Sequence, residues 1–559
     1  MLNAPRYRPD VDGLRAIAVL AVVGYHAFPD LVPGGFVGVD VFFVVSGYLI
    51  TGLILGSLER GRFSFAEFYA RRVKRIFPAL IAVLLSCGAL GWFVLLPDEY
   101  RQLGKHVAAG AGFVSNFMLW READYFDVLS DLKPLLHLWS LGIEEQFYIA
   151  WPILLYAFWR RQTALLALTL ILSAGSLALN VATVRTDAVA AFYSPLARGF
   201  ELLAGSLLAM KPARAPIPDG LRASASVVGL LLIAAALLLV DRNRLFPGAW
   251  ALLPVAGTCL ILAAGEEAWL NRHLLARSAL VRVGLISYPL YLWHWPLLSF
   301  ARIFERDEPS PALRGALVAA SVALAWMTFA AIEAPIRFGR PARAKVAALC
   351  ALMLFAGLGG LAVFRLQGLP SRSVGASARN IMAQAEWPYW EDEACVRKYA
   401  MTPCQASGAR PTVMVLGDSH ANHLYPGLAL TAPALDVLQA GTCPPLEGVA
   451  LHVLKNQDKH PCATTDYLEL NKRVLRQHPE IRTVLLVALW RNAITGELAN
   501  ARERSIWGGV RLVPADPREA GMSNAELVLR GLERTIASLR ALGVRVVLLR
   551  DTPDIASEL

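Results

Sequence analysis

The first apolar segment of the chain contains the ionisable residues Arg15 and His26. Ionisable side chains within a membrane-spanning segment are costly and usually mark functional sites. The two residues are eleven positions apart, roughly 16 Å along a helix, so they lie at different depths. Imidazole titrates near neutral pH, which makes His26 a candidate general base for a hydroxyl group. The alternative is a buried histidine that hydrogen-bonds to a helix carbonyl.

A short basic stretch, RRVKRIFP, precedes the third apolar segment. Its Arg72 and Arg75 are three positions apart and share one helix face, a spacing that suits forked contacts with phosphate oxygens. The pair predicts a cytoplasmic site for a nucleotide-containing acyl donor. Basic residues also gather in cytoplasmic loops for reasons of topology alone, and that interpretation stays open.

Further acids and histidines lie in or beside other apolar segments. Tryptophans at an interface can be simple anchors, but acids and histidines in several separate segments indicate a reaction or transport centre. The glycines near Asp40 permit close helix packing, which does not explain the acid itself. The residues concerned are Asp40, His137, Glu144, Glu145, His294 and Glu333.

The elements that must position these residues are membrane helices. The 559 residues are 56% hydrophobic and only 18% charged, with a mean hydropathy of +0.46. This composition excludes a disordered chain, a coiled coil and an ordinary cytosolic enzyme. Long apolar runs predict a polytopic helical bundle of about eleven spans. They are expected at 14–33, 36–58, 76–96, 135–159, 163–183, 196–210, 224–240, 249–265, 283–301, 312–333 and 342–364.

The net charge of +10 is assigned to topology and not to nucleic acid. The basic residues are concentrated in short loops, and these loops are all cytoplasmic if the N-terminus is cytoplasmic and residues 104–121 do not cross. That stretch is therefore predicted to be a re-entrant or surface helix. The same count places everything after about residue 366 outside.

The composition changes after residue 366. We expect a linker or extension at 366–410 and an α/β domain from 411 onward, with strands at 411–417, 434–439, 482–489 and 543–549. Four cysteines in an exported domain predict two disulfides, which allow three pairings. Local pairing favours Cys395–Cys404 and Cys443–Cys462.

Several motifs together resemble the acyltransferase-3 family of integral-membrane acyltransferases over about residues 6–340. They are YRPDVDGLRAIAVLAVVGYHAF, GGFVGVDVFFVVSGYLIT, RRVKRIFPAL, HLWSLGIEEQFY and SYPLYLWHWP. The resemblance implies transfer of an acyl group, usually acetyl, from cytoplasmic acyl-CoA to a carbohydrate outside. Residue by residue, it implies the family's paired Arg and His at Arg15 and His26, its donor motif at Arg72 and Arg75, its Ser-Gly segment at Ser46 and Gly47, and its Glu-Pro element at Glu333.

The segment TVMVLGDSHANHL resembles the SGNH hydrolase-like domain that is often fused behind such a membrane domain. The resemblance implies a nucleophile at Ser419, at a strand-to-helix turn, and an oxyanion-binding glycine at Gly441. Asn492 is a loose candidate for the third-block asparagine. The family's Asp-x-x-His does not occur before Leu559, so the domain is expected to be truncated, and His420 and His423 are too local to be assumed substitutes.

The predicted domains are an acyltransferase-3 membrane domain (1–340), an additional transmembrane helix (341–365), an extracytoplasmic linker (366–410) and an incomplete SGNH-like domain (411–559). The expected function is O-acylation of a cell-surface or exported glycan, first of all lipopolysaccharide O-antigen, by a bacterial inner-membrane enzyme with a periplasmic C-terminal domain. Acetyl-CoA is expected as the donor substrate, with membrane lipid as a further partner and no metal, permanently bound cofactor or nucleic acid. The alternative functions are a proton-coupled transporter or flippase and an esterase that works through Ser419.

Overall fold

The computed structural model describes most of the chain in two compact units, Met1–Asn380 and Ile381–Leu559. The described residues are 7–122, 130–210, 218–241, 244–305, 308–338, 343–372, 392–400, 404–408, 410–431, 436–440, 443–454, 462, 466–498 and 508–550, without the side chains of 130, 419, 423, 430, 439, 440, 466 and 467. Each unit is built around its own buried apolar residues.

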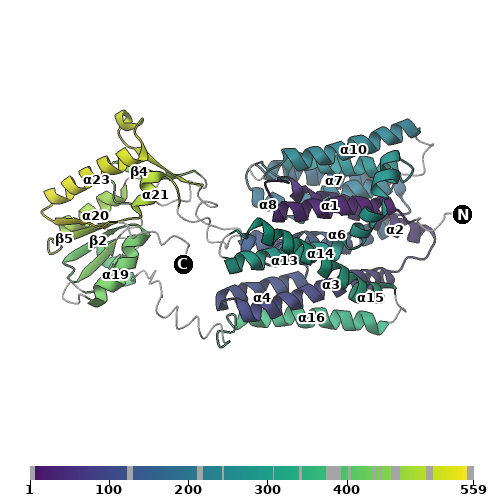
Figure 1. Cartoon of the computed structure of the whole chain (residues 1–559), viewed down its shortest axis with the longest axis horizontal. Coiled ribbons are helices and arrows are strands. Elements are labelled where there is room, and N and C mark those ends of the chain that lie inside the picture. The colour runs from purple at the N-terminus through teal and green to yellow at the C-terminus, as the bar shows by residue number, and fades with distance from the viewer. Residues whose placement is uncertain are drawn as a thin grey trace. The chain divides into compact units, whose positions relative to one another are not determined.

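The first unit is helical (Figure 1). Each predicted span overlaps one of its longer helices. These helices are α1 (Pro9–Ala27), α2 (Gly38–Glu59), α3 (Phe65–Val94), α6 (Leu138–Phe158), α7 (Gln162–Thr183), α9 (Pro195–Ala209), α10 (Asp219–Leu239), α11 (Leu252–Ala264), α13 (Ser287–Glu305), α14 (Pro311–Thr328) and α16 (Arg343–Arg365). The boundaries differ from the predicted ones by several residues in α1 and α3.

Length and apolarity single out fewer spans than the sequence prediction. Among the described residues, six stretches are long and apolar enough to cross a membrane, which supports a multi-pass membrane protein. The expected eleven crossings remain a prediction. The six stretches are Gly35–Glu59, Phe65–Val94, Gln162–Thr183, Asp219–Leu239, Pro311–Phe338 and Arg343–Arg365.

The segment 104–121 does not form one continuous helix. It is divided between α4 (Pro97–Ala111) and α5 (Ser115–Glu122). Helix α4 packs along α16 and α3, as Figure 1 shows. At about 1.5 Å per residue, α4 is about 22 Å long, which is short of a typical bilayer core. The break is compatible with the re-entrant or surface helix predicted from charge, and the sidedness of the segment stays a prediction.

Small residues bring the central helices close together. The backbones of α2 and α9 approach so closely that an added Cβ at Gly47 would collide with the carbonyl oxygen of Leu202, and one at Gly205 would collide with that of Val44. Membrane helices associate through such small-residue contacts, because the hydrophobic effect does not drive apolar side chains together in lipid.

Shorter elements connect the helices of the first unit. They are η1 (Gly35–Val37), η2 (Ser130–Leu132), α8 (Ala188–Tyr193), η3 (Gly248–Ala251), η4 (Asn271–Leu275), α12 (Ser278–Leu285), η5 (Phe329–Glu333) and α15 (Ala334–Phe338). The segments η4 and η5 are π-helical, a form that often occurs at functional sites.

The second unit has the expected α/β fold. In the described residues, its main sheet has five strands in the order β1-β3-β2-β5-β7, and β2, β3, β5 and β7 are parallel. These four are the predicted strands. The sequence reading missed the antiparallel edge strand β1 and the separate pair β4–β6. The bounds are β1 Cys404–Ala406, β2 Val413–Gly417, β3 Val437–Ala440, β4 Val449–Val453, β5 Thr483–Val487, β6 Val510–Pro514 and β7 Arg545–Leu548.

Helices cover both faces of this sheet (Figure 1). Met414 and Leu416 pack with side chains of α20 and α23, whereas Val415 packs toward α19 on the opposite face. Alternation along β2 thus places apolar side chains on both faces, as a buried parallel strand requires. The helices are α18 (Glu393–Tyr399), α19 (Ser419–Thr431), α20 (Asp466–Gln477), α21 (Trp490–Thr495), η8 (Pro517–Glu519) and α23 (Asn524–Ala541).

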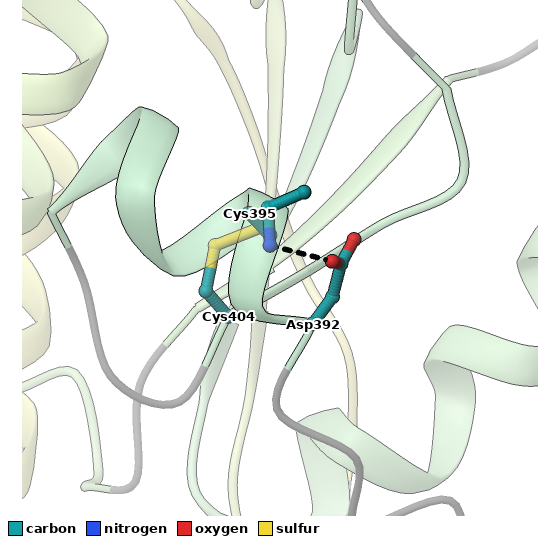
Figure 2. The surroundings of a disulfide bond; sticks show 4 residues. Asp392, Cys395 and Cys404 are labelled. Atoms are coloured by element: carbon teal, nitrogen blue, oxygen red, sulfur yellow. Dashed lines mark hydrogen bonds between the residues drawn. A yellow bond between two sulfur atoms is a disulfide. The ribbon is translucent and has the colours of Figure 1, made fainter.

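Both predicted disulfides are confirmed. Cys395 is bonded to Cys404, and Cys443 is bonded to Cys462. Figure 2 shows the first bond, which joins α18 to β1, beside the capping carboxylate of Asp392. That carboxylate accepts a hydrogen bond of 2.8 Å from the backbone N–H of Ala394 at the start of α18. The bond therefore attaches a short capped helix to the edge of the sheet.

Candidate active site

A cavity of about 840 Å³ lies within the helical unit. Its walls come from α1 and the two residues before it, and from α2, α3, α6, α9, α12, α13, η5 and α15. Glu144 and five further residues predicted from the sequence line it together. The five are Arg15, Ser46, Arg72, Arg75 and Glu333.

The cavity is rich in guanidinium groups, since Arg8 and Arg337 join the three arginines named from the sequence. Most of these groups have carboxylate partners. Arg15 pairs with Asp12 at 3.1 Å, and Arg337 pairs with Glu333 at 3.1 Å. Arg8 pairs at 2.6 Å with Asp10, just outside the lining.

Arg72 and Arg75 differ from the other arginines of the cavity. In the part of the chain that the structure describes, neither forms an ion pair with a carboxylate, and Nε of Arg72 is buried without a hydrogen-bond partner. The Arg72 guanidinium lies 6.0 Å from the ring centroids of Phe68 and Tyr148. The face of α3 predicted to bind phosphates therefore presents to the cavity a buried N–H donor that has no partner among the described residues.

Two carboxylates approach these arginines from other helices. Ser46 of α2 donates a 3.0 Å hydrogen bond to Glu144 of α6, which ties together two predicted polar segments. Glu333 ends the π-helical turn η5, and its buried Oε2 atom has no hydrogen-bond partner in the described part of the chain. The π turn shifts the helical register just before Glu333, so the acid comes from a locally distorted part of the helix.

Gly47 does not line the cavity. It occupies the face of α2 that packs on α9, and its carbonyl accepts a hydrogen bond from Ser206. This place corresponds to the helix-packing alternative for the second-segment glycines. The donor-binding role that the resemblance implied for Gly47 has no geometric support here.

His26 also lies outside the cavity lining, at the last turn of α1. Its Nδ1 atom is 2.9 Å from Nε2 of His294 on α13. The edge of the Trp295 ring packs against it, with 4.4 Å between centroids. The structure therefore separates His26 from the Arg72–Arg75 region, although the helical spacing of Arg15 and His26 is as expected.

A hydroxyl pair connects the two regions. Tyr291 lines the cavity, and its ring lies 5.6 Å from that of His294 between centroids. Its hydroxyl donates to the carbonyl oxygen of His137 at 2.8 Å and accepts from Ser140 at 2.7 Å. Neither Tyr291 nor Ser140 is singled out by the sequence, because hydroxyl groups in apolar helices carry no spacing signal of their own.

The unexplained Asp40 is part of a second buried charge cluster. Arg198 lies 3.4 Å from Asp40 and 3.0 Å from Glu201, and all three are 0% exposed. Sequence reading missed Arg198 and Glu201. Their spacing of three positions inside an apolar segment was the available signal. Among the residues that the structure describes, four aromatic rings surround the Arg198 guanidinium at 5.5–5.6 Å, from Phe43, Trp139, Phe192 and Phe246.

In the second unit, the strand-to-helix turn forms where the sequence predicted it. Strand β2 ends at Gly417 and α19 begins at Ser419. The Asp418 carboxylate accepts from the backbone N–H groups of His420 at 2.9 Å and Leu489 at 2.8 Å, so it ties the turn to the end of β5. Asn492 follows β5 in α21 and is buried. The side chains of Ser419 and His423, and all of Gly441, lie outside the described residues.

We expect the Gly417→Ala variant to destabilise this turn strongly. A Cβ at this position would collide with the carbonyl oxygen of Val487, and forcing atoms into a packed site costs about 1–3 kcal/mol or more. Urea-dependent proteolysis of the full chain measures the loss of stability. Gly427→Ala is the matched control, because its Cβ meets nothing within 4 Å and alanine favours the helix. Equal stability of the two variants would contradict the close approach of β2 and β5.

Known proteins match both units. The acyltransferase domain family matches residues 8–332, and the SGNH domain found fused to such domains matches residues 385–559. The peptidoglycan O-acetyltransferase OatA of Listeria monocytogenes is 31% identical over 353 residues, which cover 59% of this chain and 56% of that protein. The O-acetyltransferase OatA of Staphylococcus aureus strain NCTC 8325 is 30% identical over 353 residues, which cover 60% of this chain and 58% of the relative. The matches thus span little more than half the length of these relatives. No solved structure matches significantly.

Proposed function

This chain belongs to the acyltransferase-3 family, and its second unit is an SGNH-like domain; from this membership we propose that it is a membrane O-acyltransferase that moves an acetyl group from cytoplasmic acetyl-CoA to a hydroxyl of a glycan outside. The observation that carries the proposal is the convergence of Arg15, Ser46, Arg72, Arg75 and Glu333 on one cavity. These residues come from separate helices, and helix packing alone has no need to gather them.

Acetyl-CoA suits this cavity in charge and size. Its phosphates are assigned to Arg72 and Arg75, whose guanidinium groups lack carboxylate partners among the described residues. A cavity of about 840 Å³ falls within the range of roughly 300–1,000 Å³ that is usual for sites that hold small ligands. The phosphates would bring negative charge to Arg72 and Arg75, as Asp12 does for Arg15 and Glu333 does for Arg337.

His26 is assigned as the base that takes the proton of the accepting hydroxyl. The hydroxyl that accepts the acetyl group belongs either to Ser419 of the second unit or to the sugar itself. Peptidoglycan is the first acceptor to test, because the relatives are named for its O-acetylation or for O-acetylation in general. Lipopolysaccharide O-antigen, expected from the sequence, is the second.

The deciding experiment uses the full chain in proteoliposomes loaded with acetyl-CoA that carries an isotopic label in the acetyl group. Label should appear on externally added peptidoglycan fragments or O-antigen, with stoichiometric release of free CoA. A proton-coupled transporter or flippase would move a glycan or lipid without consuming acetyl-CoA. Glycan movement with no acetyl-CoA consumption would therefore overturn the proposal.

The second unit is assigned to the outer side of a bacterial inner membrane. Support comes from the basic loops expected on the cytoplasmic side and from two disulfides, which persist in oxidising compartments. In intact spheroplasts, a membrane-impermeant maleimide should label the second unit only after an impermeant reductant has been added. A cysteine introduced by Arg71→Cys should stay unlabelled under both conditions. Labelling of Arg71→Cys from outside would contradict this topology.

A further inference from the structure

The contact between His26 and His294 bears on which ring nitrogen of His26 carries a hydrogen. Nδ1 of His26 and Nε2 of His294 are 2.9 Å apart. In a pair of neutral imidazoles, one of these nitrogens donates and the other accepts. The assignment depends on what the second ring nitrogen of His294 contacts.

His294 has a fixed tautomer because of its own helix. Its Nδ1 atom lies 3.2 Å from the carbonyl oxygen of Leu290, and a carbonyl can only accept, so Nδ1 carries the hydrogen. The residue is 0% exposed, and no carboxylate forms an ion pair with it within the described ranges. An unpaired buried charge is costly, which leaves His294 neutral with an accepting Nε2.

From this geometry we propose that His294 is a positioning residue that holds His26 in the tautomer with hydrogen on Nδ1, so that Nε2 is the nitrogen that takes the proton. The inference rests on the proposed function, in which His26 is the base. The logic is that of a base whose ring is oriented by a third group. His294 acts through His26 and does not itself contact the reacting hydroxyl in this scheme.

Other contacts hold the His26 ring in place for this role. The two imidazole rings are nearly parallel, with an interplanar angle of 18° and 5.2 Å between their centroids, and Trp295 packs edge-on against His26. Arg302 of α13 donates a 3.0 Å hydrogen bond to the carbonyl oxygen of His26, which anchors the end of α1. The indole N–H of Trp295 donates in turn to the carbonyl oxygen of Lys133 at 2.8 Å.

The chemical step balances with this tautomer. As the acceptor oxygen bonds to the acyl carbon, its proton moves to Nε2 of His26. The bond between the acyl carbon and its leaving group breaks, and the proton then passes from Nε2 to the leaving group. No oxidant or further reactant is required.

Three substitutions of His294 separate tautomer control from packing. In His294→Gln, the side-chain oxygen can occupy the place of Nε2 and accept from His26. In His294→Asn, the shorter amide can replace only Nδ1, and in His294→Phe the ring is kept without any acceptor. We expect kcat for acetyl transfer to stay within about tenfold in the Gln variant and to fall by about 10²–10⁴-fold in the Asn and Phe variants. The KM for acetyl-CoA should be unchanged in all three.

A packing role predicts the opposite order, because phenylalanine fills the site better than glutamine. The inference would be overturned if His294→Phe transferred acetyl groups as fast as His294→Gln or faster. An unchanged kcat in His294→Asn would also overturn it. His26→Ala in the same membranes distinguishes the two hypotheses: activity without His26 overturns the base assignment, whereas loss with His26→Ala and no effect of His294 variants overturns only the role of His294.

Solid-state ¹⁵N NMR of histidine-labelled full chain in lipid tests the tautomer without any activity. The His26 signals are identified by their loss in His26→Gln. We expect a protonated Nδ1 and an unprotonated Nε2 in the wild type, and a mixture of tautomers in His294→Phe. A protonated Nε2 in the wild type at neutral pH would overturn the inference even if transfer activity is present.

Discussion

His26→Gln is expected to lose acetyl transfer by about 10²–10⁴-fold, the usual contribution of a positioned general base. Glutamine keeps hydrogen-bonding capacity at this position but cannot take up a proton. The donor cavity should be unaffected, because its lining does not include His26. Binding of acetyl-CoA, measured by calorimetry on the detergent-purified chain, should therefore match the wild type while turnover is lost.

The control for this variant is a substitution of Tyr25, whose ring centroid lies 5.2 Å from that of His26. Tyr25→Phe keeps the aromatic packing and should retain most of the activity. If His26→Gln turns over near the wild-type rate, His26 is only a packed histidine and the base must be sought elsewhere in the cluster with His137 and His294.

Removal of the guanidinium group of Arg72 or of Arg75 should weaken the binding of the acetyl donor. Hydrogen bonds to charged groups contribute about 1.5–3 kcal/mol each, so Arg72→Ala and Arg75→Ala should each raise the KM for acetyl-CoA by about 10–100-fold. Lysine at either position should restore only part of the affinity, since a point charge does not reproduce the planar fork. Initial rates over a range of acetyl-CoA concentrations give the values.

Arg71→Ala is the matched control, because it removes the same charge from the same turn of α3. Arg71 is exposed and pairs with Glu67 on its own helix at 3.4 Å, and it is absent from the cavity lining. The Arg71→Ala variant should insert into the membrane and bind the acetyl donor normally. Equal effects of Arg71→Ala and Arg72→Ala would show that the arginines serve topology alone.

Local patterns in the sequence were sufficient to predict many of the helices, strands and disulfides of this protein. Apolar runs predicted where the membrane helices occur, and a three-residue spacing placed Arg72 and Arg75 on one face of α3. The α/β rhythm located the four parallel strands, and the short separations of Cys395–Cys404 and Cys443–Cys462 indicated the disulfides. Each of these features depends on neighbours along the chain, where helix and strand geometry fix the relation between residues.

The contacts that give the residues their roles come from parts of the chain far apart. The contact between His26 and His294 joins positions 268 residues apart, and the bond from Ser46 to Glu144 joins positions 98 apart. No periodicity in the sequence relates such positions, because their meeting depends on how the helices pack and on which small residues let them approach. The same packing turned Gly47 toward α9, paired Asp40 with the unanticipated Arg198, and placed the His26 ring outside the arginine-lined cavity.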